Sequence, residues 1–305
     1  MKNLIICLLA TTVIWSCKTS DTTPAPTPLV ITKADYAKNY KPGGATYNFF
    51  EVSPTSVTVP TKGENQTWNF STLAETSTIT GGGAIFLTPA NAAYPSATFA
   101  YTSTLVRSVG SITSPSVAVT LFSEISDAGS YDLGYSQDAV SAINVPSLGA
   151  TINYAVQNLT YTGTTKYPNV LFPAKFGNAT TNTNGIVLTS NFTVTAAALG
   201  LNKTPGQTKI TSSVTIDIIG SGTANLKGIG NVRVLVAKNT WSDVTNYFLG
   251  GASAPAALLT NLGIIDGAVT IASTYRFIAE GLGTVGFIDV NANGVITGAS
   301  FRKGN

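Results

Sequence analysis

Short stretches of alternating or β-branched residues follow one another along most of this chain, and clusters of Gly, Pro, Asn or Ser interrupt them about every eight to twelve residues. β-Branched side chains fit a pleated surface, and the interrupting residues fit turns. Thr alone supplies 45 of the 305 residues. The clearest strand segments are residues 56–60, 66–71, 117–125, 151–161, 186–195, 209–219, 232–237, 270–278 and 295–301. The pattern predicts an all-β protein, built as an antiparallel β-sandwich.

One segment departs from the strand pattern and predicts a short helix over residues 254–262. Ser253 can cap this helix, Pro255 suits its first turn and Gly263 can end it. If the first 16 of the 305 residues are removed, 289 remain, which is large for one sandwich of immunoglobulin size. We therefore also consider two tandem sandwich subdomains, an N-terminal β region over residues 29–162 and a C-terminal β region over residues 163–305.

The composition excludes most catalytic templates. The chain contains no His, so it cannot build a Ser-His-Asp or Cys-His system or a His-ligated zinc site. Seventeen Lys and Arg against 14 Asp and Glu give a net charge of +3, too thinly spread for a nucleic-acid surface. The chain also lacks the Gly-x-Ser-x-Gly nucleophile motif. We expect no catalytic residues, no nucleic-acid partner and no resident cofactor.

Residues 1–16 have the features of a signal peptide. Lys2 precedes an apolar run over residues 4–14, which is shorter than the roughly 20 residues that a membrane-spanning helix needs. The sequence Ile14-Trp15-Ser16-Cys17 that ends this run resembles the lipobox of bacterial lipoproteins. The resemblance implies cleavage after Ser16 and acylation of Cys17. Ordinary secretion with an unmodified Cys17 is the alternative.

Residues 17–28 comprise this Cys and a Pro/Thr-rich tether, whose prolines favour an extended spacer. Lys18 stands where an Asp would retain a Gram-negative lipoprotein in the inner membrane, so the resemblance implies the outer membrane, facing either the periplasm or the cell surface. Thr22 lies in an Asp-Thr-Thr sequence that resembles a bacterial O-glycosylation acceptor; an unmodified linker is the alternative. The expected partners are the membrane, through the lipid, and an envelope protein or a glycan.

Residues 289–294 resemble the opening of a calcium-binding loop. Asp289, Asn291 and Asn293 supply alternate oxygen ligands, and Gly294 permits a sharp turn. The twelfth position is Ser300, however, where such a loop needs a bidentate carboxylate. Asn293-Gly294 is also a strong hairpin signal. We expect a hairpin turn, with a weak calcium site as the alternative.

Two further patterns indicate alternative functions. The densest acidic segment contains Glu124, Asp127, Asp132 and Asp138, and a pair of these could serve a carboxylate-dependent, glycan-active enzyme. Exposed aromatic residues would instead suit a carbohydrate-binding surface module, and the candidates are Trp68, Phe70, Tyr131, Trp241, Tyr247 and Phe248. Burial in the core is the expected role of these aromatic residues.

Several short sequences together resemble uncharacterised β-rich secreted lipoproteins of Bacteroidota-type bacteria. They are Trp68-Asn-Phe-Ser71 after Gly63-Glu-Asn-Gln66, Leu171-Phe-Pro173, Phe176-Gly177, Ala198-Leu-Gly-Leu-Asn202, Pro205-Gly206, Tyr247-Phe-Leu-Gly-Gly251 and residues 254–263. The resemblance covers most of the mature chain and implies export, β architecture and a place in the cell envelope. It supplies no activity or site residue. The leading prediction is a lipid-anchored envelope protein with a non-enzymatic structural or interaction role.

Overall fold

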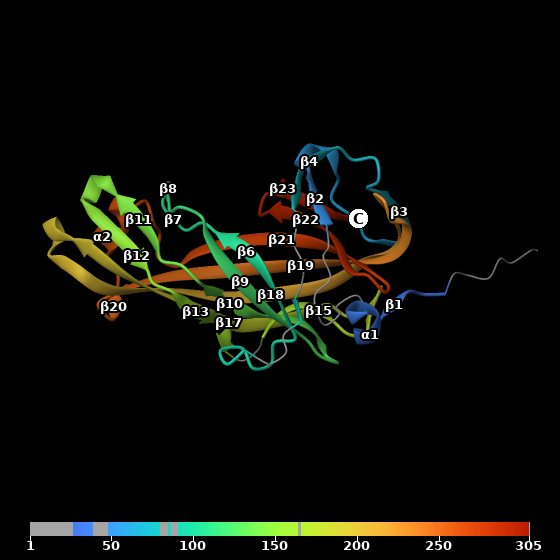
Figure 1. Ribbon diagram of the computed structural model, residues 1–305, viewed down its shortest axis with the longest axis horizontal. Helices are drawn as coiled ribbons and strands as arrows, with labels where there is room; N and C mark the ends of the chain where they lie inside the picture. Colours follow the sequence, from blue (N-terminus) through green and yellow to red (C-terminus); the bar gives the residue numbers. More distant parts are fainter. Residues whose placement is uncertain (1–26, 39–47, 80–84, 87–90, 164–165, 305) are drawn as a thin grey trace, which may run out of the picture.

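The computed structural model describes residues 27–38, 48–79, 85–86, 91–163 and 166–304. Two large, mainly antiparallel sheets pack face to face, and two short helices lie at opposite ends of the molecule (Figure 1). The predicted all-β sandwich is therefore confirmed.

The larger sheet contains 13 strands. Its main path runs through β11 (Ser141–Val145), β12 (Ala150–Tyr154), β17 (Thr181–Ala196), β18 (Leu201–Leu226), β19 (Gly230–Leu249), β21 (Ala268–Ala279), β22 (Gly283–Asn291), β23 (Ile296–Lys303), β2 (Asn48–Val52) and β4 (Glu75–Ile79). Three more strands pair beside this path: β14 (Thr162–Gly163) on β17, β20 (Ala252–Ser253) on β19, and β3 (Gly63–Asn69), which runs parallel to β18.

The smaller sheet has six strands and covers the middle of the larger one (Figure 1). Its strands are β13 (Gln157–Thr160), β10 (Gly129–Gln137), β9 (Val117–Ile125), β6 (Phe99–Leu105) and β5 (Ile85–Phe86), with β15 (Tyr167–Leu171) also paired to β10. The expected division between residues 162 and 163 falls inside β14, and both sheets contain strands from either side of it.

Smaller elements complete the fold. Two-residue strands pair as β1 (Val30–Ile31) with β16 (Ala174–Lys175), and as β7 (Ser108–Val109) with β8 (Ile112–Thr113). Single 3₁₀ turns occupy Pro54–Ser56, Pro146–Leu148 and Ala197–Leu199. The helices are α1 (Lys33–Ala37) and α2 (Ala256–Asn261). The predicted helix is thus confirmed as α2.

The first helix, α1, begins with a reciprocal capping box. The Asp35 backbone N–H donates to Thr32 Oγ1 at 3.3 Å, and the Thr32 backbone N–H donates to Asp35 Oδ2 at 3.0 Å. These bonds satisfy backbone donors that a helix start leaves unpaired. The pattern Thr-x-x-Asp was a readable signal that the strand-based prediction passed over.

Most predicted strands are present, but one is absent and another is divided in two. Residues 117–125 form β9 as expected. Residues 56–60 are not a strand, because a 3₁₀ turn at Pro54–Ser56 precedes an unpaired stretch. Residues 151–161 divide into β12 and β13, which belong to different sheets, so the chain crosses from one layer to the other between them.

Several glycines of β18 look like turn residues in the sequence, but the strand continues through them. A Cβ atom on Gly222 would lie 2.0 Å from the backbone oxygen of Gln66 on β3. Glycine is therefore required there because a neighbouring backbone approaches closely, and the chain does not turn. This explains how β18 reaches 26 residues and pairs with β19 along most of its length.

The two faces of the larger sheet bury different cores. On β19, Val234 and Val236 point into an aromatic core with Phe277 and Phe301, while Leu235 and Ala237 point toward the smaller sheet. The alternation follows from the two-residue period of a strand. Both faces of this part of the sheet are thus covered, which is why its strands read as nearly continuous apolar runs.

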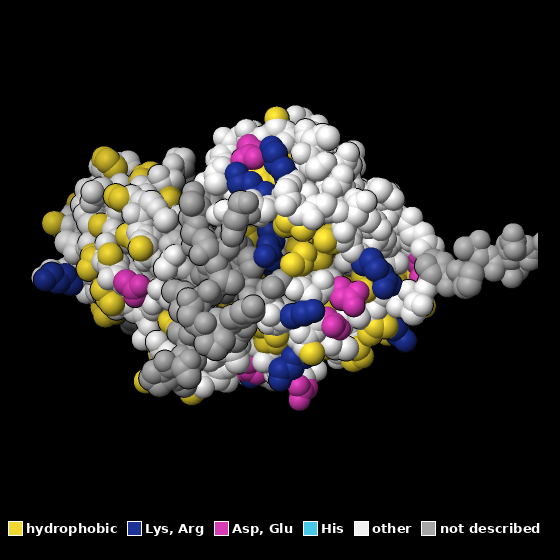
Figure 2. All heavy atoms as spheres, turned by 45° about the vertical axis from the view of Figure 1, so that its right-hand side comes forward, with side chains coloured by type: hydrophobic (Ala, Val, Ile, Leu, Met, Phe, Trp, Pro, Cys, Tyr) yellow, Lys and Arg dark blue, Asp and Glu magenta, His cyan; other side chains and the backbone are white. Residues whose placement is uncertain are grey.

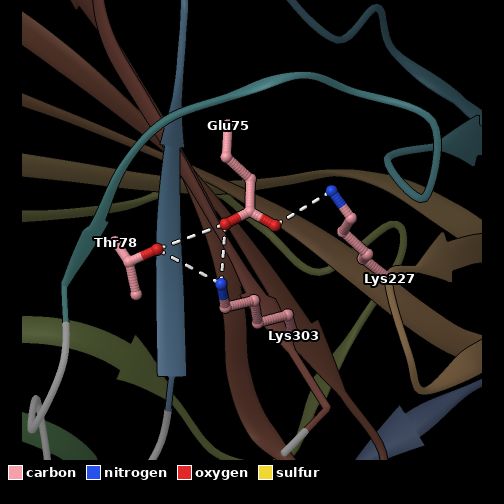
Figure 3. A network of polar contacts seen from close by, with 4 residues as sticks. All are labelled: Glu75, Thr78, Lys227 and Lys303. Carbon is pink, nitrogen blue, oxygen red and sulfur yellow. Dashed lines mark hydrogen bonds and ion pairs between the residues drawn. The ribbon is translucent and has the colours of Figure 1, made fainter.

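A charged network fastens the edge strand β4 to its surroundings (Figure 3). Glu75 contacts Lys303 Nζ at 2.6 Å and Lys227 Nζ at 2.9 Å, and accepts a hydrogen bond from Thr78 Oγ1 at 3.2 Å. The hydrogen bonds from Lys303 and Lys227 lower the pKa of Glu75 to about 2. On the face shown in Figure 2, most of the described surface is uncharged, and the charged side chains lie in several small groups.

Candidate functional site

A cavity of about 330 Å³ lies at the end of the sandwich that carries α2, β11 and β12 (Figure 1). Its walls come from the inner face of β17, β18 and β19, from β12, from residues 105–109 and from α2. The volume is at the lower end of the range for small-molecule sites.

Strand alternation builds the floor of this cavity. Every second residue of one stretch of β17 lines it, namely Leu188, Ser190, Phe192, Val194 and Ala196. Because side chains alternate between the faces of a strand, the intervening residues point to the other face. The small side chains of Ala150 and Ala196 leave room that larger residues would fill.

Helix α2 covers the cavity with leucines. Gly263 follows the helix at φ +66°, and the Ile264 N–H then donates to the Leu259 carbonyl at 2.9 Å. This left-handed helix end satisfies terminal carbonyls and directs the chain back toward the sheet. As a result Leu258, Leu262 and Ile264 all line the cavity. At the other end of α2, the N-cap is Pro255 rather than the expected Ser253.

The cavity reaches the protein surface. Val106 is 53% exposed and Leu199 is 48% exposed, and both line it. Exposed aliphatic side chains at the mouth of an apolar cavity are compatible with entry of an apolar molecule.

A polar group stands among these apolar walls. The Arg107 guanidinium stacks 4.1 Å from the centre of the Tyr154 ring and donates from Nη2 to Gln137 Oε1 at 2.8 Å. Tyr135 and Tyr247 also line the cavity. Burial raises the pKa of Tyr135, Tyr154 and Tyr247, so these phenols keep their protons near neutral pH.

Ser190 adds a buried hydroxyl to the floor. It is 7% exposed, and its Oγ has no hydrogen-bond partner among the residues that the structure describes. Native proteins pair most buried polar groups, so such a hydroxyl calls for an explanation. A bound molecule that presents a polar atom to Ser190 would provide it.

The calcium-like loop forms the turn between β22 and β23. Asn291 Oδ1 accepts from the backbone N–H groups of Asn293 and Val295, at 3.0 and 3.1 Å. Asp289 Oδ1 accepts from Thr274 Oγ1 at 2.6 Å. These contacts describe a hairpin turn whose oxygens serve the protein itself. Within the described ranges, no group of three or more Cys, Asp or Glu side chains is placed to hold a metal ion.

The four acidic residues of the dense segment have separate partners. Glu124 pairs with Lys166, and Asp127 pairs with Lys33. Asp132 accepts hydrogen bonds between the two sheets, and Asp138 accepts from Thr120 and Ser136. This arrangement offers no observation in favour of a catalytic pair.

The candidate sugar-binding aromatic residues mostly support cores. Phe70 is buried, and Trp68 packs edge-on against Phe277 with ring centres 5.4 Å apart. Trp241 packs against the buried cluster of Ile186, Val214 and Ile216. Tyr247 and Phe248 line the cavity instead, and Tyr131 is half-buried.

Cys17 and Thr22 lie outside the described residues. In the part of the chain that the structure describes, no helix is long and apolar enough to cross a membrane.

Comparisons with known proteins supply no relative for this chain. No protein-family model matches it, and neither the curated proteins nor the solved structures contain a significant match. The cavity therefore has to be interpreted from its own residues, and sequence reasoning had not identified it. The two-residue spacing of the side chains from Leu188 to Ala196 indicates that they share one face of a strand. The sequence does not show that no other element packs closely against this face.

Proposed function

We propose that this protein is a non-enzymatic, lipid-anchored protein of the bacterial outer membrane that binds a small apolar molecule. The observation that carries the binding role is the cavity, which has aliphatic walls, an exposed mouth and the unpaired Ser190 hydroxyl. Ligand sites are typically concave and mostly apolar, with a few polar groups that orient the ligand. The lipobox-like sequence at Cys17 supports the anchor.

Filling the cavity should weaken binding. Thr208 on β18 lines the cavity, so in Thr208→Trp the indole would occupy the space of a ligand. We expect dodecan-1-ol to bind the mature chain carrying Cys17→Ser, in which no protein-borne acyl chain competes, and to bind at least tenfold more weakly once Thr208→Trp is added, a difference of about 1.4 kcal/mol. Isothermal titration calorimetry measures both affinities.

Thr211→Trp is the matched control. Thr211 lies three residues further along β18 and therefore on the opposite face, away from the cavity. This variant should bind dodecan-1-ol like the parent. Equal affinity of the two tryptophan variants, or absence of binding by the parent, would contradict the proposed binding role.

The anchor is tested by replacing the acylated residue. Cys17→Ser removes the thiol that the lipid would modify, so the protein should move from the membrane fraction to the soluble fraction. Cys7→Ser is the control, because residue 7 lies in the segment expected to be removed. Fractionation with radiolabelled palmitate measures both effects. Membrane retention of the Cys17→Ser protein would exclude lipid anchoring.

A further inference from the structure

We propose that the cavity selects a single-chain carboxylate, with Arg107 as the residue that recognises the carboxylate head. This inference rests on the proposed function and names the class of ligand for the same site.

The first argument is charge. A guanidinium is always protonated in a protein, and a partly buried cation is stable only when it is well paired. Arg107 is half-buried, and the side-chain acceptors that it contacts, Gln137 Oε1 and the Tyr135 hydroxyl, are both neutral. No Asp or Glu is among the described residues that line the cavity, and none of the described carboxylates forms an ion pair with Arg107. A ligand carboxylate would supply the missing charge.

The second argument is orientation. Gln137 is fully buried, and its Nε2 donates to the Ala139 carbonyl at 2.8 Å. This bond fixes the amide so that Oε1 faces Arg107 and accepts hydrogen bonds from both Nε and Nη2 of the guanidinium. The Tyr154 ring also contacts this group, because the guanidinium lies over it, 4.1 Å from the ring centre. Arg107 is therefore held in place before a ligand arrives, which reduces the entropy lost on binding.

The third argument is the supply of donors. Arg107 and three tyrosines line the cavity together with Ser190, whose hydroxyl has no partner among the described residues. All five side chains carry N–H or O–H donors. A carboxylate has two oxygens that accept several hydrogen bonds, and a guanidinium binds it with two parallel bonds. A neutral alcohol offers fewer acceptor sites and no charge.

The remainder of the cavity fits an aliphatic chain. Leu188, Val194 and Leu258 line it together with other apolar side chains, and they present no polar atoms. Chain burial supplies most of the binding free energy, while the head group decides which chain is selected.

The test compares two ligands that differ at the head, dodecanoate and dodecan-1-ol, at pH 8 on the mature chain carrying Cys17→Ser. We expect dodecanoate to bind at least tenfold more tightly. Adding Arg107→Gln should remove this preference while the affinity for dodecan-1-ol changes less than threefold. Arg107→Lys, which keeps the cation but loses the fork, should retain part of the preference.

Arg233→Gln is the charge-matched control. Arg233 lies at the far end of β19, beside Glu280, so its replacement should leave the preference intact. Equal binding of the two ligands by the parent would overturn the carboxylate inference and leave the proposed function standing. Absence of binding by either ligand would overturn both. If Arg107→Gln and Arg107→Lys each lose both ligands equally, Arg107 shapes the cavity and does not recognise the head, and the inference also fails.

Discussion

Replacing Phe277 by Ala should lower the free energy of unfolding by about 4 kcal/mol. Phe277 is 0% exposed, and its ring lies 5.4 Å from that of Trp68, 5.0 Å from that of Phe70 and 6.0 Å from that of Phe301. Truncation removes the burial of a large side chain and leaves a cavity that these surrounding rings cannot fill. Urea unfolding followed by tryptophan fluorescence measures the loss.

Phe49→Ala is the control for this prediction. Phe49 is only half-buried, and its ring centre lies 6.0 Å from that of Phe287. Its truncation should lower the free energy of unfolding by about 1 kcal/mol, because less area leaves water on folding. Equal losses for the two variants would show that the aromatic core is not the main source of stability at this end of the sandwich.

Replacing Arg276 by Met should lower the free energy of unfolding by about 3 kcal/mol at pH 7. Arg276 Nη2 donates to Asn169 Oδ1 at 2.9 Å, and Asn169 Nδ2 donates to Asp132 Oδ1 at 2.8 Å. Burial between the sheets raises the pKa of Asp132, and the positive charge of Arg276 opposes this shift. Without Arg276, an ionised Asp132 would stay half-buried between the sheets without the cation that offsets its charge.

The same variant should show a pH dependence of defined sign. The folded-state pKa of Asp132 lies above its ordinary value of 3.8, so ionisation of this group works against folding as the pH rises. Removing Arg276 raises the folded-state pKa further. The stability lost in Arg276→Met should therefore be larger at pH 7 than at pH 4, as measured by urea unfolding at both values.

A double variant separates charge from packing. Adding Asp132→Asn to Arg276→Met removes both charges and keeps an amide oxygen for Ser123 Oγ, which donates to Asp132 at 2.8 Å. We expect at least half of the lost stability to return at pH 7. An equal loss at both pH values, with no recovery in the double variant, would show that Arg276 acts through its contacts alone.

The local pattern of the sequence was sufficient to predict the fold class and one helix. β-Branched alternation predicted β9 in full, and the Ala/Leu segment before Gly263 predicted α2. The sequence did not predict the strand lengths, because a glycine can either mark a turn or permit the close approach of another backbone. Gly222 does the second, beside the backbone of Gln66. Only the tertiary position of β3 distinguishes the two.

The candidate site was hidden for a related reason. Arg107 and Gln137 are 30 residues apart, and nothing local to either predicts their contact. The motif that did stand out, around Asp289, forms a turn whose oxygens bind neighbouring protein groups. A short motif shows which ligand atoms a segment can offer. A cavity, by contrast, forms where neighbouring elements leave part of a strand face uncovered.

The length of β19 sets the distance between the cavity and Thr27, at the start of the described part of the chain. The Arg233 side chain, near the start of this strand, donates to the carbonyl of Thr27, where the tether meets the fold, and Tyr247 at the other end lines the cavity. At about 3.3 Å per residue, these positions are roughly 46 Å apart along the strand. In a chain anchored at Cys17, the cavity mouth can therefore stand well clear of the lipid headgroups. The ligand would then arrive through the aqueous phase or from a second protein, without direct extraction from the bilayer.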